Sequence, residues 1–453
     1  MQLAAAARAM SATLVTGDGL FAGVSTDTRT LVPGQLFFAL RGPNFDAHAK
    51  LGEAAAAGAA GAVVAARRPL ALPQIETADV RGALGRLALD WRRQFRVPVL
   101  AVTGSAGKTT VKEMLAAIMR IQGEVLATLG NLNNDIGVPL TLCGLASTHT
   151  SAVIEMGANH AGDIALLAHI AAPQVGIVTL CAPAHLAGFG SLEGVARAKG
   201  ELFSGLDADG VAVINAEDPF APLWRELAGK RRIVSFGEGA MVRARAVRNV
   251  AERTEFMLCM QSGEDIPISL AHRGQHNVRN ALAAAAAASA VGVALVDIKR
   301  GLEQAATVGG RLHFRRGPQG ARVIDDSYNA NPASLAAALA VLAAEPGPRW
   351  LVLGDMAELG DHAERYHRDA GAGAGAAGVE CVFSIGALAR TALEAFPGMG
   401  VHCADHGELL AALTTALAAR RDAPPTILIK GSRVMALDQI ADALAARSAP
   451  ACC

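Results

Sequence analysis

The chain has 453 residues, which is too long for one ordinary domain and indicates about three domains, each large enough to bury a core. Lys plus Arg and Asp plus Glu are balanced at 41 each, so no global field draws the protein toward nucleic acid or an anionic membrane, and a small anionic substrate would need a local basic site. The seven cysteines are scattered and free of C-x-x-C spacing, which favours reduced thiols in the cytoplasm over disulfides or a zinc site.

Residues 1–96 mix short strand-like runs with Ala-rich stretches and predict a small α/β domain. The start MQLAAAARAM lacks a cationic n-region and carries Arg8 where a signal peptide would be apolar, so it predicts a first helix. The runs GQLFFAL and AGAVVAA predict strands over 34–40 and 60–66. Pro98 follows the basic stretch WRRQFRV, and we place a domain boundary there.

Residues 97–312 predict a central domain with a mostly parallel sheet and helices on its faces. The apolar runs VPVLAV, SAVIEMG, VGIVTL, VAVIN and RIVSFG each end in polar residues or glycine and alternate with helical segments. Residues 240–270 alternate differently and predict a small antiparallel insert. The uncharged stretch 281–296 falls short of the ~20 strongly apolar residues that a bilayer requires, so it predicts a buried helix and no membrane insertion.

The sequence TGSAGKT lies between a strand and a helix and predicts a phosphate-binding loop, although Val102 stands where the strict pattern has its first glycine. Gly104 and Gly107 let backbone N–H groups converge on phosphate oxygens, and the helix start adds a partial positive charge. Lys108 can reach the outer phosphates, and the Thr109 hydroxyl can bind Mg²⁺. The alternative is a glycine-rich turn that happens to contain a lysine. The absence of N-K-x-D weighs against a GTP switch.

Polar side chains follow other strands of this sheet, at the edge where ligands bind in such folds. Glu155 ends one strand and can hold a metal against the phosphates, although a lone Glu there is more often a helix cap or a salt-bridge partner. His185 can be a second metal ligand or an ordinary loop histidine. Asn215 and Asp218 can contact a nucleotide or make a turn.

Residues 313–453 predict a C-terminal, Rossmann-like doubly wound domain, because ARVID, RWLVLGD, VECVFSIG and TILIKG are separated by Ala-rich helices. The run GAGAGA at 371–376 could imitate a dinucleotide-binding loop. It lacks both the G-x-G-x-x-G spacing and a clear strand before it, so we favour a helix end or tight packing.

Several motifs occur along the chain in one order: TGSAGKTTVKEM, GNLNNDIGVPLTL, EMGANH, PAHLAGFGS, AKGE, GQHNVRNALAA, DDSYNANP and LGDMAELG. In this order they resemble the Mur ligase superfamily, and most closely its MurF family. The resemblance implies a UDP-sugar-binding domain (1–96), an ATP-binding domain (97–312) and a C-terminal domain (313–453) that closes over both. It also implies an ADP-forming ligase that joins D-alanyl-D-alanine to UDP-N-acetylmuramoyl-tripeptide through an acyl phosphate in peptidoglycan synthesis. We expect a monomer.

The same resemblance implies ATP and Mg²⁺ as cofactors and assigns residues to four roles. The nucleotide is assigned to Gly104, Ser105, Gly107, Lys108, Thr109, Thr110, His276, Asn277, Arg311, Asp326, Tyr328 and Asn329. The metal is assigned to Thr109, Glu155, His185 and a carbamate on Lys199. Catalysis is assigned to Lys108, Lys199, His185 and Arg311. The substrates are assigned to Ser25, Asp27, Arg29, Asn44, Asp46, His48, Asn133, Asn134, Lys430, Ser432 and Arg433.

Without the resemblance, several of these residues have simpler interpretations. Lys199 is an ordinary helix lysine, since a carbamate requires a neutral amine and therefore a lowered pKa. His276 and Asn277 can be helix caps, Arg311 a solvated linker charge, and the Asp326 region an Asx turn.

The chain departs from the family pattern around PAHLAGFGS, where cysteine and alanine precede the motif and Ala187 replaces an acidic residue. Two siblings are the nearest alternatives: the ligase that adds a diamino acid, whose D-N-P-R signature is absent, and the ligase that adds glutamate to folate. A regulatory ATPase without ligation is a third alternative.

Overall fold

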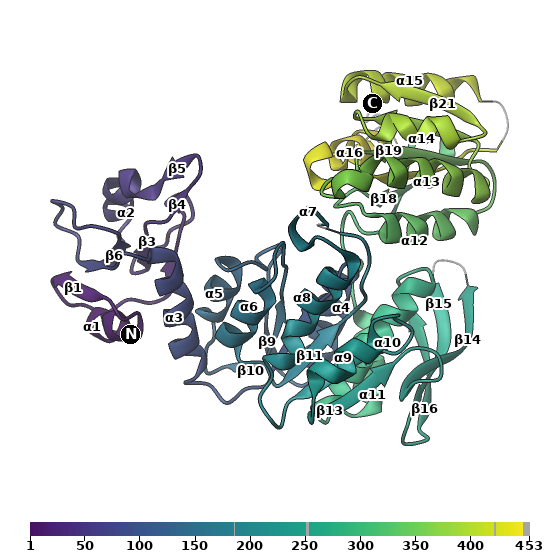
Figure 1. The fold of residues 1–453 in the computed structure, drawn as a ribbon. Coiled ribbons are helices and arrows are strands. Elements are labelled where there is room, and N and C mark those ends of the chain that lie inside the picture. The colour runs from purple at the N-terminus through teal and green to yellow at the C-terminus, as the bar shows by residue number, and fades with distance from the viewer. Residues whose placement is uncertain (185, 251–252, 421–422, 447–453) are drawn as a thin grey trace, which may run out of the picture.

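The computed structural model describes residues 1–184, 186–250, 253–420 and 423–446, which form three α/β domains in chain order (Figure 1). The N-terminal domain lies apart at one end, and the C-terminal domain lies over the central one. The sheets are mostly parallel, as the sequence predicts. The boundaries at 96/97 and 312/313 remain proposals.

The N-terminal domain is a five-stranded sheet in the order β1-β7-β6-β3-β2. The strands are β1 (Thr13–Thr16), β2 (Val24–Ser25), β3 (Leu36–Phe38), β6 (Gly61–Val64) and β7 (Gln74–Glu76), with a hairpin of β4 (Arg41–Gly42) and β5 (Phe45–Asp46). The helices are α1 (Leu3–Ala9), the 3-10 turn η1 (Ala47–Lys50), α2 (Leu51–Ala56) and α3 (Val80–Arg92). The first helix and the two predicted strand runs are confirmed.

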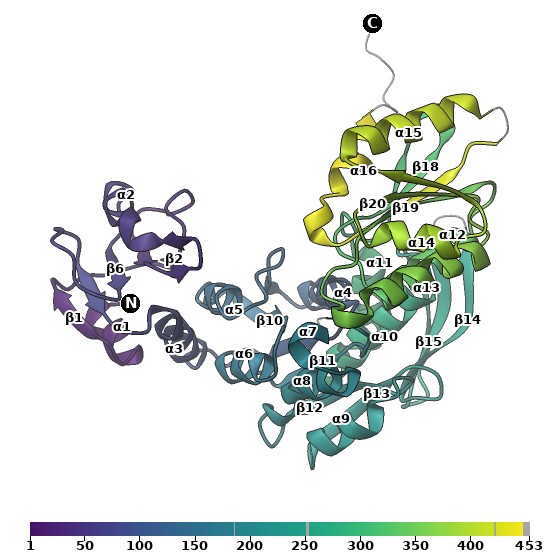
Figure 2. The ribbon, with the colours of Figure 1, turned by 45° about the horizontal axis from the view of Figure 1, so that its top comes forward.

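Helix α3 joins the first two domains (Figure 2). In this helix the side chain of Leu84 is buried in the N-terminal core, whereas the side chain of Ala88 is buried in the central core. Trp91 Nε1 donates to the carbonyl oxygen of Leu145 at 3.0 Å. One helix therefore contributes to two cores and links the N-terminal domain to the central domain.

The central sheet has the order β16-β15-β14-β13-β12-β11-β8-β10-β9. Its strands are β8 (Val99–Thr103), β9 (Glu124–Ala127), β10 (His149–Glu155), β11 (Val175–Val178), β12 (Val211–Asn215), β13 (Arg232–Phe236), β14 (Val242–Val250), β15 (Arg253–Met260) and β16 (Asp265–Leu270). The strands from β9 to β13 are parallel, and β14, β15 and β16 are antiparallel to one another. The predicted antiparallel insert is confirmed, and it extends the main sheet because β14 pairs with β13.

The helices of this domain cover both faces of the sheet. They are α4 (Lys108–Arg120), α5 (Gly137–Leu142), α6 (Asp163–Ala171), α7 (Leu186–Phe189), α8 (Leu192–Ser204), α9 (Ala221–Ala228), α10 (Gln275–Ala290) and α11 (Leu295–Gln304). None of the helices in the described part of the chain is long and apolar enough to cross a bilayer.

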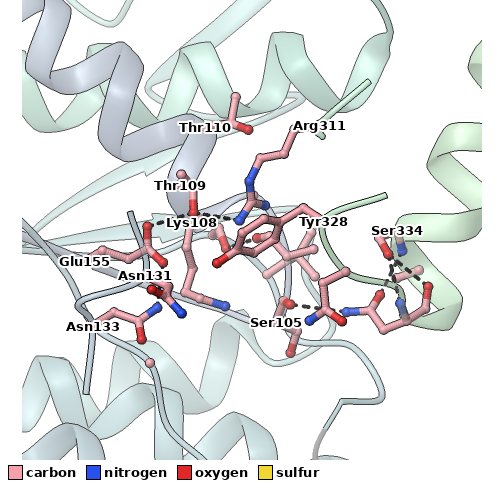
Figure 3. A pocket seen from close by; sticks show the side chains of 18 of the residues that line it. Ser105, Lys108, Thr109, Thr110, Asn131, Asn133, Glu155, Arg311, Tyr328 and Ser334 are labelled. Atoms are coloured by element: carbon pink, nitrogen blue, oxygen red, sulfur yellow. Dashed lines mark hydrogen bonds between the residues drawn. The ribbon is translucent and has the colours of Figure 1, made fainter. Parts of the chain in front are cut away.

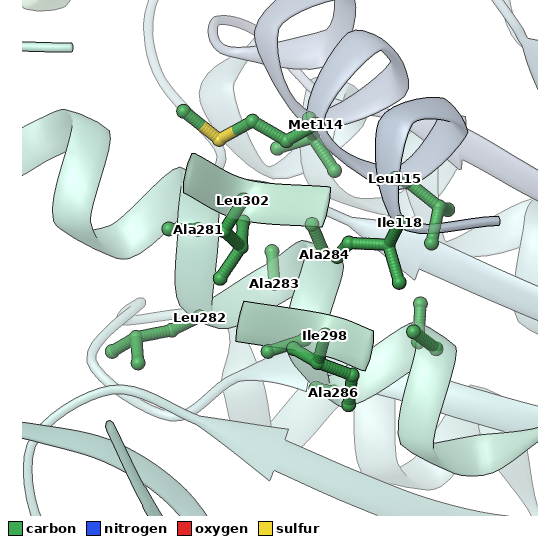
Figure 4. Packing of buried hydrophobic residues seen from close by; sticks show 14 of the residues in the cluster. Met114, Leu115, Ile118, Ala281, Leu282, Ala283, Ala284, Ala286, Ile298 and Leu302 are labelled. Carbon is green, nitrogen blue, oxygen red and sulfur yellow. The ribbon is translucent and has the colours of Figure 1, made fainter. Parts of the chain in front are cut away.

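Helix α10 is the predicted buried helix, and its alanines pack against α4 and α11 (Figure 4). Because an alanine side chain is a single methyl group, Met114 and Ile118 of α4 and Leu302 of α11 fit closely beside it. The prediction over 281–296 was too long, since α10 ends at Ala290 and the chain turns at Gly292, whose φ is +83°.

The C-terminal sheet has the order β17-β18-β22-β19-β20-β21, which confirms a doubly wound fold with one antiparallel edge strand, β17. Its strands are β17 (His313–Arg316), β18 (Arg322–Asp326), β19 (Arg349–Gly354), β20 (Cys381–Ile385), β21 (Met399–Cys403) and β22 (Thr426–Lys430). Its helices are α12 (Pro332–Ala343), α13 (Ala363–Ala376), α14 (Ala389–Ala395), α15 (His406–Ala419) and α16 (Asp438–Ala446), with 3-10 turns η2 (Pro318–Gly320), η3 (Gly360–His362) and η4 (Arg433–Met435).

The GAGAGA run forms the end of α13 and packs tightly against α14, which confirms the preference for packing over a dinucleotide loop. A Cβ atom at Gly371 would lie 1.9 Å from the carbonyl oxygen of Ala392. At Gly373 the nearest atom, in Leu339, would be 3.7 Å away, which is an ordinary contact. There is therefore room for an added methyl group at Gly373 but not at Gly371.

We expect Gly371→Ala to destabilise the protein by about 1–3 kcal/mol, because the added methyl group overpacks the contact between α13 and α14. Gly373→Ala is the matched control and is expected to stabilise α13 by about 0.5–1 kcal/mol, since alanine favours a helix. Calorimetric unfolding temperatures check both, and equal shifts in the same direction would contradict the packing argument.

Candidate functional site

The phosphate loop joins β8 to α4, as the sequence predicts, and only glycine fits at its two turning points. Gly104 has a φ of +145°, and a Cβ there would lie 1.9 Å from Thr179 Oγ1. Gly107 caps α4 with a φ of +82°, and a Cβ there would lie 2.5 Å from Asn280 Oδ1. The Ser105 hydroxyl donates to the carbonyl oxygen of Ala182 at 2.9 Å and holds the loop between these turns.

We expect Gly107→Ala to weaken nucleotide binding about tenfold, since a left-handed alanine costs about 1–2 kcal/mol before the contact with Asn280 is counted. Calorimetric titration with ADP measures the effect. Gly52→Ala in α2 is the control, because nothing lies within 4 Å of the added Cβ atom. Unchanged ADP affinity in Gly107→Ala would exclude the loop from nucleotide binding.

Four predicted residues meet beside the loop: Lys108, Thr109, Glu155 and Asn133 (Figure 3). Lys108 Nζ donates to the carbonyl oxygen of Gly104 at 2.7 Å. Thr109 Oγ1 donates to Glu155 Oε2 at 2.8 Å, and the other carboxylate oxygen accepts from Asn133 Nδ2 at 2.8 Å. Burial lowers the pKa of Lys108, and the nearby charge of Glu155 partly opposes this change. The cluster therefore offers one ammonium group and two adjacent oxygen ligands.

The linker between the second and third domains brings Arg311 to the same point. Its Nη2 donates to Thr109 Oγ1 at 2.8 Å, although the two residues are 202 positions apart. The guanidinium lies 4.4 Å from the centre of the Tyr328 ring, and Arg433 lies 5.9 Å from the same ring. Arg311 is therefore a fixed charge facing the loop and not a solvated linker charge.

The C-terminal domain also contacts the loop directly. Asn331 caps α12 in a reciprocal pair of hydrogen bonds with Ser334, and its Nδ2 donates to the carbonyl oxygen of Ser105 at 3.2 Å. This contact places the start of α12 against the phosphate loop.

Lys430 forms a buried ion pair with Asp326 and donates to the carbonyl oxygen of Asn329 at 3.0 Å. Burial raises the pKa of Asp326, and the charge of Lys430 opposes the change. Arg433 is more exposed and lies 2.8 Å from Asp438. Of the two basic residues, Arg433 is therefore the more accessible to a substrate carboxylate.

Lys199 lies on α8 with its side chain only 2% exposed. Its Nζ is 3.4 Å from the carbonyl oxygen of Ala158 and 5.2 Å from the centre of the Phe189 ring. Burial, reinforced by the charge of Lys108, lowers the pKa of Lys199 to about 7. Lys199 is thus not an ordinary exposed helix lysine. His185 lies outside the described residues.

At the start of α10, burial lowers the pKa of His276 to about 4. Gly274 is the N-cap residue of α10. The interpretation of His276 and Asn277 as helix caps is therefore wrong. Asn277 is buried, and its amide is already hydrogen-bonded to Arg273 and Asn280.

These residues line a cleft of about 1250 Å³ formed by all three domains. The predicted site residues at the cleft are Ser105, Gly107, Lys108, Thr109, Thr110, Asn133, Asn134, Glu155, His276, Asn277, Arg311, Asp326, Tyr328, Asn329, Lys430, Ser432 and Arg433. Lys199 lies behind the wall of this cleft.

The predicted residues of the N-terminal domain do not line the cleft. Ser25 Oγ donates to the carbonyl oxygen of Asp27, and Asp27 forms an exposed ion pair with Arg29. His48 Nδ1 lies 2.6 Å from Asp46 Oδ1, and its Nε2 accepts from the backbone nitrogen of Ala65. Asn44, the remaining predicted residue of this group, is exposed at the turn between β4 and β5.

The cleft residues that were absent from the predicted set include Arg81, Asp135, Asn280 and Asn331. The spacing of Asn280, three residues after Asn277, could have indicated it, because the two lie on one helix face. The ion pair between Arg81 of α3 and Asp135 joins two domains, and no local pattern marks such a contact.

The fold and the site define a three-domain protein with a phosphate-binding loop in its middle domain and a C-terminal domain docked over it. The chain matches the Mur ligase middle domain over residues 102–288 and the Mur ligase, glutamate ligase domain over residues 310–433. It is 44% identical over 424 residues to the UDP-N-acetylmuramoyl-tripeptide–D-alanyl-D-alanine ligase of Escherichia coli (strain K12), covering 93% of each chain. The chain belongs to the MurF family of Mur ligases.

Two solved structures show the same similarity across the three domains. A crystal structure of MurF from Acinetobacter baumannii has a TM-score of 0.92 at 36% identity and covers 97% of this chain and 98% of that one. MurF ligase from Thermotoga maritima in complex with ADP has a TM-score of 0.83 at 25% identity and covers 94% of this chain and 97% of that one.

Proposed function

We propose that the protein is an ATP-dependent, ADP-forming ligase that joins D-alanyl-D-alanine to UDP-N-acetylmuramoyl-tripeptide and so makes the pentapeptide precursor of peptidoglycan. The observation that carries the proposal is the convergence of Lys108, Thr109, Glu155 and Arg311 at one cleft. The names of the relatives, at up to 44% identity over nearly the whole chain, supply the substrates.

The chemistry explains why a peptide ligase needs a phosphate loop. A carboxylate is a poor electrophile at neutral pH, and transfer of a phosphoryl group from ATP converts one of its oxygens into part of a good leaving group. The amine of the dipeptide then attacks the acyl carbon, the peptide bond forms, and phosphate departs. We propose that Lys108 and Arg311, which lie beside the loop, stabilise the negative charge that develops on the transferred group.

We propose that Mg²⁺ binds at Thr109 and Glu155, whose oxygens lie together beside the loop. Bound there, the ion would neutralise phosphate charge. Within the described residues no group of three or more His, Cys, Asp or Glu side chains comes together, so nucleotide oxygens and water would complete the ligands. A carbamate on Lys199 and His185 are proposed for a second ion.

We further propose that the N-terminal domain holds the UDP-sugar and that Asn133 and Asn134, which line the cleft, contact the UDP-muramoyl substrate. Ser432 and Arg433 line the cleft from the third domain and are proposed for the dipeptide carboxylate. A monomer in the cytoplasm is the proposed setting.

ATP-dependent phosphate release tests the proposal. Purified protein with UDP-muramoyl-tripeptide is given D-alanyl-D-alanine, single amino acids or no amine. Release only with the dipeptide, together with a product of the corresponding mass, is expected. Release with a single amino acid would favour a sibling ligase, and equal release without an amine would indicate an ATPase without ligation.

A further inference from the structure

A buried ion cluster joins the C-terminal domain to the central domain at the start of α10. Glu345 follows α12, and its side chain is 0% exposed. Its carboxylate lies 2.6 Å from Nη1 of Arg273, which precedes α10, and 2.8 Å from Nη1 of Arg322 in β18. Both guanidiniums also lie near the Phe314 ring, at 4.7 and 5.6 Å from its centre. One carboxylate therefore holds a cation from each of two domains.

The two domains are closely packed at this point. Gly274, the N-cap of α10, has a φ of +97°, and a Cβ there would lie 2.8 Å from Val341 of α12. In Figure 1, α12 is on the side of the C-terminal domain that faces the central domain. The ion cluster thus marks where α12 rests on the first turn of α10.

The cluster favours the docked arrangement for an electrostatic reason. A carboxylate that is withdrawn from water is costly unless cations surround it, and removal of one partner leaves an uncompensated charge. The contacts of Glu345 lack the angles of hydrogen bonds, so the carboxylate is held mainly by charge. Movement of α12 away from α10 would separate Glu345 from Arg273.

Two hydrogen bonds lead from this cluster to Asn280, which lies against the phosphate loop. The carbonyl oxygen of Arg273 accepts from Asn277 Nδ2 at 2.8 Å, and Asn277 Oδ1 accepts from Asn280 Nδ2 at 3.0 Å. The Asn280 amide oxygen lies against Gly107, where a Cβ would be only 2.5 Å away. Both asparagines are buried, so a shift of the Arg273 backbone would be transmitted through them to the support of the loop.

We propose that Arg273 and Glu345 are positioning residues that couple the docking of the C-terminal domain to the geometry of the phosphate loop, through Asn277 and Asn280. The coupling concerns the nucleotide site of the proposed function and rests on it. Asn277 would then transmit the docking of the C-terminal domain to the phosphate loop, in addition to any contact with the nucleotide.

Binding of ADP and the radius of gyration test the coupling in the full-length chain. Arg273→Met and Glu345→Gln are expected to raise the Kd for ADP about tenfold, a typical size for coupling between sites, and to increase the radius of gyration from small-angle X-ray scattering. Arg322→Met is the matched control, since it removes the cation that lies in the same domain as Glu345. It is expected to lower the unfolding temperature and leave the Kd for ADP unchanged.

The Asn280→Ala variant tests the link to the phosphate loop separately from the docking contact between Arg273 and Glu345. It is expected to raise the Kd for ADP without changing the radius of gyration, because the docking contact stays intact. An unchanged Kd in both Arg273→Met and Glu345→Gln, or an equal rise in Arg322→Met, would overturn the coupling. If circular dichroism shows that Arg273→Met does not fold, the Kd of Glu345→Gln tests the coupling instead, because glutamine keeps the shape of the glutamate side chain. If the unsubstituted protein bound no ADP, the proposed function would fail first, and the coupling with it.

Discussion

Lys108→Met is expected to lower kcat about 10²–10³-fold, the usual cost of removing one preorganised group that stabilises developing charge. Lys108 lies in the cleft, and its ammonium is held by the loop itself through the carbonyl oxygen of Gly104. A bound phosphate group would add negative charge beside this lysine and so favour its charged form. The rate of phosphate release in the presence of both substrates measures the effect.

Lys112→Met is the matched control for this experiment. Lys112 lies one turn further along α4, is more deeply buried than the half-buried Lys108, and pairs with Glu113 and the carbonyl oxygen of Thr128, away from the cleft. Its replacement is expected to reduce stability with a much smaller change in kcat. Near-normal turnover in Lys108→Met, or equal losses in the two variants, would remove Lys108 from the mechanism.

Lys199→Ala is expected to lower kcat about 10²-fold or more if a carbamate on this lysine holds a metal ion. Short carboxylates such as acetate are expected to restore part of the activity, since the shortened side chain leaves room for a carboxylate where the carbamate would stand. Burial, reinforced by the charge of Lys108, lowers the pKa of Lys199 to about 7, so the neutral amine that reacts with CO₂ is present near neutral pH.

Two further measurements separate this explanation from a structural role. A carbamate signal in the ¹³C NMR spectrum of protein supplied with labelled bicarbonate is expected for the unsubstituted chain and not for Lys199→Arg. Lys199→Arg keeps a positive charge but cannot be carbamylated, so acetate is not expected to restore its turnover. Failure of acetate to restore Lys199→Ala, in protein that still binds ADP, would contradict the metal-binding role.

The fold could be predicted where strands are buried on both faces, because a continuous apolar run is then the only pattern that fits. The strands β8, β11 and β12 are of this kind. In the central and C-terminal domains, the strands β9, β17 and β21 were missed for the opposite reason: they lie at sheet edges and are only partly buried, so their sequences lack such a run. Their pairing comes from neighbours that are distant in sequence.

The candidate site could be predicted where its residues share one short segment. The phosphate loop is local, since its glycines and Lys108 lie within five positions, and the carboxyl end of a neighbouring strand indicated Glu155. The contacts of Asn331 with Ser105 and of Glu345 with Arg273 join separate domains, and nothing in either local sequence marks the partner. The resemblance to a family supplied Arg311, which the residues alone left as a linker charge.

Because α3 links two cores, a rotation of this helix relative to the central domain would displace the N-terminal domain. The 13 residues of α3 span about 20 Å, so a rotation of about 10° at its contact with the central domain would carry the far end through about 3.5 Å. The loops of the N-terminal domain lie farther out and would move more. A long substrate anchored at one end by that domain would therefore be advanced or withdrawn along the cleft by small changes in the packing of Ala88 and Trp91 against the central domain.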